Sequence, residues 1–203
     1  MMRSPLALRC SLLVWVTAIV GLLLSTAAQA QKFDITPVAE KKVPQLPPGP
    51  LFWRIDTFPT LAEAKAVTSP TALPAEVAGK AWLFTLGPPG GSSPGGSKVA
   101  EIGPVPSFTA PEYLLRINRA GGPPGAKTPV HMHPGVETFY VLSGELTQKM
   151  PDGLHRVSAG QSMPGHSPNT PMQVSSSGTS EVSVLVMFVT DATQPFSSPA
   201  TMQ

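Results

Sequence analysis

Two histidines, a turn and a glutamate stand together in the segment GAKTPVHMHPGVETFYVLSG, residues 125–144. One residue separates His131 from His133, and Glu137 follows four residues after His133. In a β-strand, side chains two residues apart point to the same face and lie about 6–7 Å apart. Both imidazoles can therefore lean onto one metal ion at about 2.0–2.1 Å from each ring nitrogen. The spacing predicts a metal site, with a carboxylate as a third candidate ligand.

Glu137 can join the histidines only if the chain reverses direction. In a continuing strand it would lie about 13 Å beyond His133. Pro134 and Gly135 can make the reversal, because proline presets φ and glycine is free to take a positive φ. A two-residue turn there would pair His133 with Val136 and put Glu137 on the wrong face. We therefore predict a three-residue or bulged hairpin in which His133 pairs with Glu137.

The sequence around this cluster has the pattern of short strands joined by turns. The 203 residues include 25 prolines and 18 glycines, and long helical periodicity is nearly absent. Many short strands without helical crossovers indicate an antiparallel sandwich or barrel. We expect strands at residues 81–86, 98–105, 113–119, 129–133, 137–142, 146–150, 154–157 and 181–189. The last of these is apolar at nearly every position, which predicts a strand covered on both faces.

One short helix and one low-complexity loop are predicted before residue 98. The helix is expected at residues 61–67, because Thr60 and Glu63 have the spacing of a capping box and good helix formers follow. Residues 87–97, GPPGGSSPGGS, predict a flexible loop between two strands. We interpret this loop as a surface insertion, and the alternative is a flap over a cavity mouth.

Residues 1–30 have the pattern of a secretory signal peptide. Arg3 and Arg9 give a positive start, residues 12–24 form an apolar run, and Ala28-Gln29-Ala30 gives a small-x-small cleavage site. The run is short for a membrane span, which needs about 20 apolar residues. We therefore expect a product that is exported, either periplasmic or secreted. An uncleaved N-terminal anchor is the minority alternative.

Beyond residue 30 the chain is neutral and lacks cysteine. Arg3 and Arg9 account for the formal net charge of +2, which leaves 12 basic and 12 acidic residues. The only cysteine, Cys10, lies in the predicted signal segment, so we expect neither disulfides nor thiolate chemistry in the rest. Without a basic cluster there is no electrostatic footprint for nucleic acid or for anionic lipid. The expected partner is a small-molecule substrate or ligand, with no nucleic acid and no membrane after signal cleavage.

The histidine segment resembles the first motif of the cupin superfamily at every fixed position. The matching residues, at the family's spacing over twenty positions, are Gly125, His131, His133, Glu137 and Gly144. The resemblance implies a cupin-type jelly-roll β-barrel, or double-stranded β-helix, so the expected fold class is all-β with one short N-terminal helix. It also implies that His131, His133 and Glu137 are metal ligands that line the barrel interior.

The second cupin motif is present in compressed form at residues 160–169, GQSMPGHSPN. The order of glycine, proline, glycine, histidine and asparagine is the family's, but proline to histidine spans two residues where the family pattern has five. His166 is the candidate for a fourth metal ligand. A shortened loop that fails to bring it inward would leave three protein ligands. His155 is the other contender, and we interpret it as a half-exposed strand histidine.

Alternation along the strands predicts which other side chains face the cavity. Phe139 and Val141 share the parity of Glu137, so we expect them to line the barrel interior. Arg116 and Arg119 lie on opposite faces of their strand, so at most one of them can face inward.

These ligands suit one divalent transition metal, which can be iron, manganese, nickel, copper, cobalt or zinc. In an apolar barrel with open coordination positions, such an ion supports Lewis-acid or oxygen-activating chemistry. We therefore predict an exported metal-dependent enzyme, a dioxygenase-like oxidoreductase, that acts on a small organic molecule bound at the metal. Glu137 is the candidate catalytic base. The alternative is a non-catalytic metal-binding or small-ligand-binding cupin, or a sensing one, of the cell envelope.

The predicted organisation is a single folded domain with short flanking segments. The resemblance is clearest over residues 113–189, and cupin barrels that pair through their edge strands make a homodimer a further expectation. The expected parts are the signal peptide at 1–30, a proline-rich extended arm at 31–50, one cupin barrel domain at 51–192 with its core motif at 125–169, and a C-terminal tail at 193–203.

Overall fold

The computed structural model describes residues 32–202. The predicted signal peptide at residues 1–30, with Cys10, lies outside the described residues. Within the described part, no helix is long and apolar enough to cross a membrane. Antiparallel strands make up most of this part, together with one short helix. The predicted all-β fold class is confirmed.

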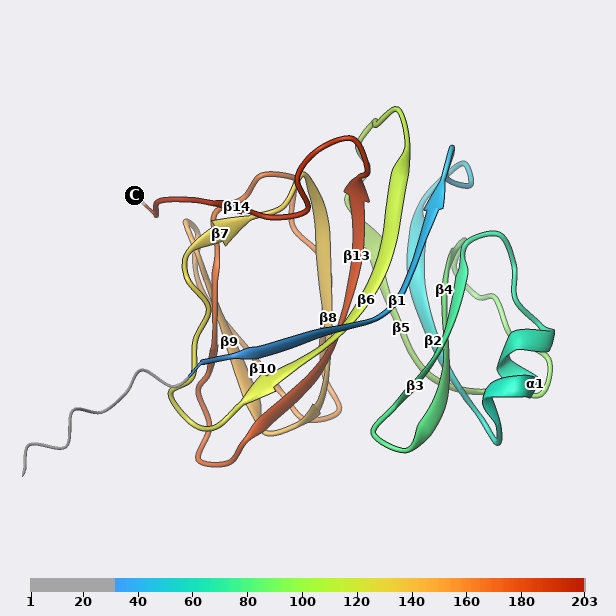
Figure 1. Ribbon diagram of the computed structural model, residues 1–203, viewed down its shortest axis with the longest axis horizontal. Coiled ribbons are helices and arrows are strands. Elements are labelled where there is room, and N and C mark those ends of the chain that lie inside the picture. Colours follow the sequence, from blue (N-terminus) through green and yellow to red (C-terminus); the bar gives the residue numbers. More distant parts are fainter. Residues whose placement is uncertain (1–31, 203) are drawn as a thin grey trace, which may run out of the picture.

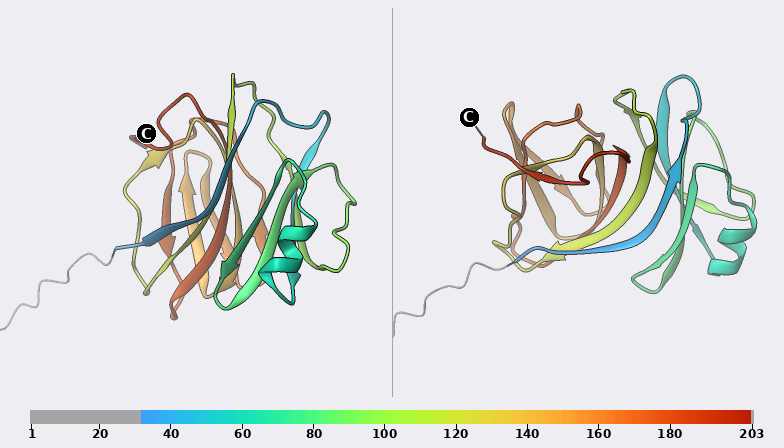
Figure 2. Two further views of the ribbon diagram at one scale, coloured as in Figure 1. Left: turned by 45° about the vertical axis from the view of Figure 1, so that its right-hand side comes forward. Right: turned by 45° about the horizontal axis from the view of Figure 1, so that its top comes forward.

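A central five-stranded sheet is covered on both faces. Figure 1 shows a barrel on the left, a smaller sheet with the helix on the right, and the long strands β13, β6 and β1 between them. The views in Figure 2 show the same two units on either side of these strands. The strands of the central sheet, in spatial order, are β1 (Asp34–Val43), β6 (Tyr113–Gly122), β13 (Val182–Asp191), β8 (Gly135–Ser143) and β11 (Ser162–Met163).

The barrel forms on one face of the central sheet. Apolar side chains from both walls fill its interior, among them Val141, Leu146 and Val184. A three-stranded sheet makes the opposite wall, and a two-stranded ribbon joins the C-terminal segment to the rim. These strands are β9 (Glu145–Met150), β10 (Gly153–Ser158) and β12 (Gln173–Ser176) in the wall, and β7 (His131–Met132) and β14 (Ser198–Pro199) in the ribbon.

A second sheet covers the outer face of the central sheet. Trp53 and Phe84 from the second sheet pack with Leu115 and Met187 from the central sheet in one buried cluster. The strands of the second sheet are β2 (Leu51–Phe58), β3 (Ala72–Val77), β4 (Lys80–Gly87) and β5 (Ser97–Val105). This sheet holds the strands that come before the barrel motif, so residues 51–105 do not form barrel walls.

The side chains of β13 alternate between the two faces of the central sheet, and both faces are packed. Leu185, Met187 and Val189 face the second sheet, whereas Val186 and Phe188 face the barrel. All five are buried, which explains the uninterrupted apolar run in the sequence. The prediction of a strand covered on both faces is confirmed.

Strand β1 occupies the first half of the predicted proline-rich arm. It pairs antiparallel with β6 from Asp34 to Val43, and the register shifts between Pro37 and Ala39. Because β6 is its only partner among the described strands, β1 is an edge strand of the central sheet. Proline is tolerated at bulges in edge strands, and exposed charged side chains keep such an edge from pairing with another chain. Residues 34–43 of the predicted arm therefore form a protected edge strand, and the prolines that suggested an arm follow it in residues 44–50.

The helix α1 (Leu61–Ala66) forms where the sequence predicts it. Thr60 accepts a hydrogen bond from the backbone N–H of Glu63, and the Glu63 carboxylate accepts one from the backbone N–H of Thr60. This capping box satisfies two backbone donors at the start of the helix. Ala64 is fully buried against the second sheet, in a cluster with Phe58 and Leu83.

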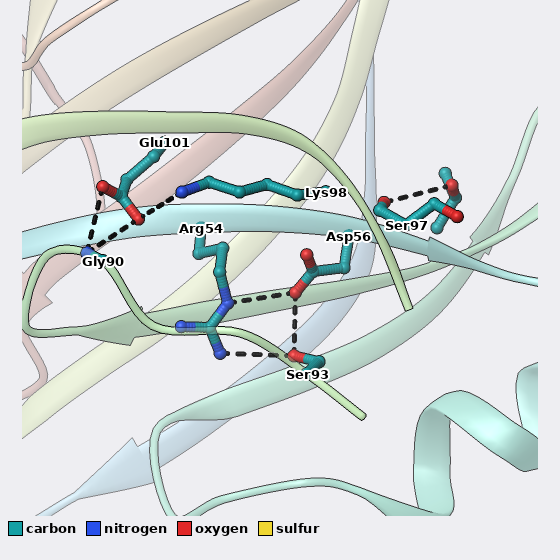
Figure 3. A network of polar contacts seen from close by, with 8 residues as sticks. Arg54, Asp56, Gly90, Ser93, Ser97, Lys98 and Glu101 are labelled. Carbon is teal, nitrogen blue, oxygen red and sulfur yellow. Dashed lines mark hydrogen bonds and ion pairs between the residues drawn. The ribbon is translucent and has the colours of Figure 1, made fainter. Parts of the chain in front are cut away.

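The glycine-rich loop between β4 and β5 is tied to the second sheet by polar contacts (Figure 3). The Asp56 carboxylate accepts hydrogen bonds from Ser93 Oγ at 2.8 Å and from Arg54 Nε at 3.0 Å. Arg54 Nη2 also donates to Ser93 Oγ at 3.2 Å. No residue of this loop lines the barrel cavity, so the alternative of a flap over that cavity is wrong.

Gly144 and Gly160 have similar backbone conformations but different surroundings. Substitutions at these two positions therefore test how closely Gly144 approaches the neighbouring strand. Both have positive φ, at 73° and 79°. An added Cβ at Gly144 would lie 2.6 Å from the carbonyl oxygen of Glu181, whereas one at Gly160 would meet nothing within 4 Å. We expect Gly160→Ala to lower the free energy of unfolding by about 1–2 kcal/mol through its backbone conformation alone. Gly144→Ala should cost about 1–3 kcal/mol more, because the backbone must shift.

Urea unfolding followed by circular dichroism measures both variants. Equal losses of stability would contradict the close approach at Gly144.

Candidate metal centre

The segment with the two histidines does not form a hairpin. It passes from the two-stranded ribbon, which contains β7, into the central sheet, which contains β8. The predicted pairing of His133 with Glu137 is wrong, because β7 pairs with β14 and β8 pairs with β13 and β11. The chain leaves the barrel rim at Pro134 and enters the central sheet at Gly135. A Cβ at Gly135 would collide with the backbone of Val189, so glycine permits this entry. The prediction failed because it assumed that neighbouring strands must pair locally.

The turn between β7 and β8 nevertheless brings the three predicted side chains together. The candidate donor atoms of His131, His133 and Glu137 all lie within 4.8 Å of one another. His133 Nε2 and Glu137 Oε1 are 3.9 Å apart. The two imidazole rings are nearly perpendicular, with centroids 5.1 Å apart. His133 and Glu137 are 3% and 4% exposed, and His131 is half-buried at the rim.

Hydrogen bonds to backbone carbonyls fix which ring nitrogen of each histidine carries the proton. His133 Nδ1 donates to the carbonyl of Phe196 at 2.6 Å, and His131 Nδ1 donates to that of Pro129 at 2.9 Å. A carbonyl oxygen can only accept, so the lone pair of each ring lies on Nε2. Histidines that ligate metals make this kind of contact through the other ring nitrogen.

His133 Nε2 has no hydrogen-bond partner among the described residues, although it is buried. A buried acceptor without a partner is costly and calls for an explanation. A metal ion between this nitrogen, His131 and Glu137 supplies one, since imidazole nitrogen and carboxylate oxygen are ligands of transition metals. The residues present therefore fit a metal ion.

Burial shifts the protonation of both buried members of the cluster. It raises the pKa of Glu137 to about 8 and lowers the pKa of His133 to about 4. At neutral pH, without an ion, the carboxyl is therefore mostly protonated and the imidazole is neutral, so their contact is not an ion pair. A bound cation favours the carboxylate form of Glu137. Strongly shifted groups that face one another in a cavity are typical of functional sites.

His166 points towards the cluster but lies behind Gln148. Its Nε2 is 3.5 Å from Gln148 Nε2, and Gln148 Nε2 also donates to Glu137 Oε2 at 3.3 Å. His166 Nδ1 donates to the carbonyl of Ser167 at 3.2 Å, which leaves Nε2 free to accept from the amide. Burial lowers the pKa of His166, which favours this neutral form. His166 is not part of the three-residue donor group, and its role as a fourth ligand stays a prediction.

His155 lies on the outer side of the barrel wall, as we expected. Its Nε2 is 3.0 Å from a carboxylate oxygen of Asp152, and its side chain is 39% exposed. It takes no part in the donor group.

The donor group opens onto an apolar cavity of about 380 Å³ inside the barrel. Phe139 lines the cavity, and Val141 is buried in the barrel core below it, so the predicted inward parity is confirmed. Arg116 faces the barrel side and Arg119 is exposed. The aromatic side chains of the lining are Phe33, Phe139, Phe188 and Phe196.

Sequence reasoning missed two residues at this centre. Gln148 is fully buried, and its place in the inward stripe between Leu146 and Met150 was a signal, because an amide there breaks an apolar pattern. Phe196 lies in the segment predicted to be a tail, and its ring contacts His133 with centroids 4.8 Å apart. A single aromatic residue in an otherwise small and polar segment was the only signal for it.

One protein family matches part of this chain. Residues 121–188 match the family described as the cupin domain. No curated protein matches the chain at a significant level. Among solved structures, DMSP lyase DddQ from Ruegeria pomeroyi DSS-3 is 22% identical over 42% of this chain and 43% of its own, with a TM-score of 0.38.

Two further structures show the same partial likeness. Polyketide cyclase RemF from Streptomyces resistomycificus is 19% identical over 44% of this chain and 62% of its own, with a TM-score of 0.37. An RmlC-like cupin family protein with a double-stranded β-helix fold from Methanocaldococcus jannaschii is 19% identical over 37% of this chain and 70% of its own, with a TM-score of 0.35. This chain spans less than two thirds of the length of the lyase and of the cyclase.

Residues 125–144, the first motif, contain strands β7 and β8 and the turn between them. The family match covers residues 121–188 around this motif. This part of the chain is therefore similar to the cupin domain, and the β-barrel that it helps to form is the fold that this similarity implies.

Proposed function

We propose that this chain is an exported, metal-dependent cupin enzyme of the dioxygenase type, which acts on a small organic molecule bound at the metal. One observation carries the proposal. The buried Nε2 of His133 has no hydrogen-bond partner within residues 32–202 and faces Glu137 at 3.9 Å, at an apolar cavity. Export rests on the sequence pattern of residues 1–30 alone.

In this proposal His131, His133 and Glu137 hold one divalent transition metal. The two imidazoles present Nε2, and the carboxylate presents Oε1 towards His133. Three protein ligands leave coordination positions for water or substrate. When bound, the metal supplies Lewis-acid or oxygen-activating chemistry.

The cavity walls bind the organic part of the substrate. A volume of about 380 Å³ is near the lower end of the range for ligand pockets, which suits a small molecule. Phe139 and Phe188 offer flat apolar surfaces next to the donor group. Apolar walls also exclude water, which strengthens electrostatic interactions inside the site.

Glu137 has a second role in this proposal, as the base that accepts a substrate proton. Gln148 Nε2 holds Glu137 Oε2, so Oε1 keeps its direction towards the histidines. Away from a bound cation, the buried surroundings that raise the pKa of Glu137 favour a proton on the carboxyl group. An apolar site that raises a carboxyl pKa towards the working pH is how enzymes adapt carboxylates to proton transfer.

A non-catalytic binding or sensing barrel is the second candidate function. Among the described residues that line the cavity, Glu137 is the only carboxylate, and His131 and His133 are the only imidazoles. The cavity thus has no separate acid–base pair once these three hold an ion. The same pocket can hold a ligand at the metal without turning it over.

The metal site predicts a specific pattern of metal content. We expect purified wild-type protein to carry about one transition-metal ion per chain. His131→Ala and Glu137→Gln should lower the affinity by at least about 100-fold, because each removes a donor of a three-residue set. Elemental analysis and competition with a chelator give the two quantities.

His155→Ala is the matched control for these variants, because it removes an exposed histidine outside the donor group. The same trace metal in the wild type and in the ligand variants would exclude the metal site and both functions built on it.

His166→Ala separates a direct ligand from a group that acts through Gln148. Because His166 Nε2 meets the Gln148 amide and only Gln148 meets Glu137, we expect the substitution to weaken metal binding by about tenfold or less, at the lower end of the loss for an outer contact. A loss as large as that of Glu137→Gln would show that His166 binds the ion directly. The same competition assay measures it.

Oxygen uptake distinguishes the enzyme from the binding module. With the metal loaded, we expect oxygen consumption with at least one member of a panel of phenols, flavonoids and diketones, and none with His131→Ala. An oxygen electrode and product analysis by mass spectrometry measure this. Binding of panel members without oxygen consumption or product would favour the non-catalytic barrel.

A further inference from the structure

The carbonyl oxygen of Phe196 makes the only described hydrogen bond of the His133 ring. It accepts from His133 Nδ1 at 2.6 Å, across 63 positions of the sequence. The bond fixes the proton on Nδ1 and thereby presents the lone pair of Nε2 to Glu137. A residue of the C-terminal segment therefore orients a group in the middle of the first cupin motif.

The segment before Phe196 is held by one carboxylate. Asp191 ends β13, and its Oδ1 accepts hydrogen bonds from the backbone N–H of Thr193 at 2.9 Å and from Thr193 Oγ1 at 2.6 Å. Its Oδ2 accepts from Gln194 Nε2 at 2.7 Å. Such a turn, built on an aspartate side chain, reverses the chain. The reversal sends residue 196 back towards the barrel interior.

The segment after Phe196 is held by the strand that carries the other histidine. In the ribbon of β14 and β7, Ser198 pairs with Met132 and Pro199 pairs with His131. The backbone N–H of Ala200 also donates to the carbonyl of Val130 at 3.2 Å. Figure 1 shows β14 running beside β7 at the rim of the barrel. Phe196 is thus fixed from both sides in the chain.

The Phe196 ring packs into a cluster of tilted aromatic rings. Its centroid lies 4.8 Å from that of His133 and 4.9 Å from that of Phe188, and Phe188 lies 4.9 Å from His133. Rings tilted at these distances attract one another. The Arg116 guanidinium lies 4.3 Å from the centroid of Phe196, within the range of a cation–π contact. These contacts hold both the plane of the imidazole and the backbone of residue 196.

We propose that Phe196 is a positioning residue of the metal centre, which fixes the tautomer and the ring orientation of His133 so that Nε2 faces the ion. The inference rests on the proposed metal site. With this role for Phe196, the C-terminal segment is part of the metal centre. That segment lies outside residues 121–188, which match the cupin domain. The contacts of Phe196 with the donor group are those with the His133 ring, so Phe196 acts on the ion through His133.

His131 provides an internal comparison. Its Nδ1 donates to the carbonyl of Pro129, which lies two residues away, so its tautomer does not depend on Phe196. Loss of the Phe196 contacts should therefore change His133 and leave His131 as it is. A general loosening of the barrel would change both histidines.

The test records the imidazole nitrogens of metal-free, full-length protein. Long-range ¹H–¹⁵N spectra at pH 7.5 should show His133 and His131 both as the Nδ1–H tautomer. In Phe196→Ala we expect His133 to become a mixture of tautomers while His131 keeps its own. Affinity for added Mn²⁺ or Zn²⁺ should fall by about 10–100-fold, as it does when an outer contact of a ligand is lost.

Two further variants complete the design. Phe196→Tyr keeps the ring and should restore both the tautomer and the metal affinity. Phe108→Ala removes a half-buried ring that contacts Tyr113, away from the centre, and should change neither. Unchanged His133 signals and metal affinity in Phe196→Ala, or equal changes at both histidines, would overturn the positioning role.

The wild-type spectrum tests the proposal even if Phe196→Ala does not fold. A His133 ring with its proton on Nε2 would overturn it, whether or not the protein binds metal. A His133 ring with a hydrogen-bonded Nδ1 proton in a protein that binds no metal would leave the contact standing and exclude the proposed function.

Discussion

Burial of the central sheet on both faces is the constraint on which the rest of the structure depends. Strand β13 alternates its side chains between the barrel core and the cluster under the second sheet. Because each face is packed, the strands cannot slip by one residue without moving apolar side chains into the wrong core. Glu137 on β8 lies opposite Phe188 on β13, so this fixed register also sets the position of the Glu137 carboxylate along the barrel.

The donor group exists at the expense of local stability. His133 and Glu137 are almost fully buried, and burial disfavours the charged form of each. The surroundings limit the cost through backbone carbonyls that hold the Nδ1 protons and through Gln148, which donates to Glu137. Among the described residues they leave His133 Nε2 without a hydrogen-bond partner, and the proposed metal ion would satisfy it.

Local patterns in the sequence were enough to predict much of this molecule. The capping box of Thr60 and Glu63, the strands from residue 113 onward and the inward face of Phe139 are all confirmed, because each depends on neighbours within a few residues. The meeting of His131, His133 and Glu137 was also predicted. The hairpin meant to bring them together was wrong, because β7 and β8 each find distant partners.

The sequence by itself determined the donor types, their spacing and the alternation that points His131 and His133 to one side, since these are properties of neighbouring residues. Only the tertiary structure decided what surrounds them. Gln148 lies between Glu137 and His166, and Phe196 reaches His133 from 63 positions away. Such contacts depend on how separate strands and the C-terminal segment close around one cavity, and no pattern within a short window encodes that closure.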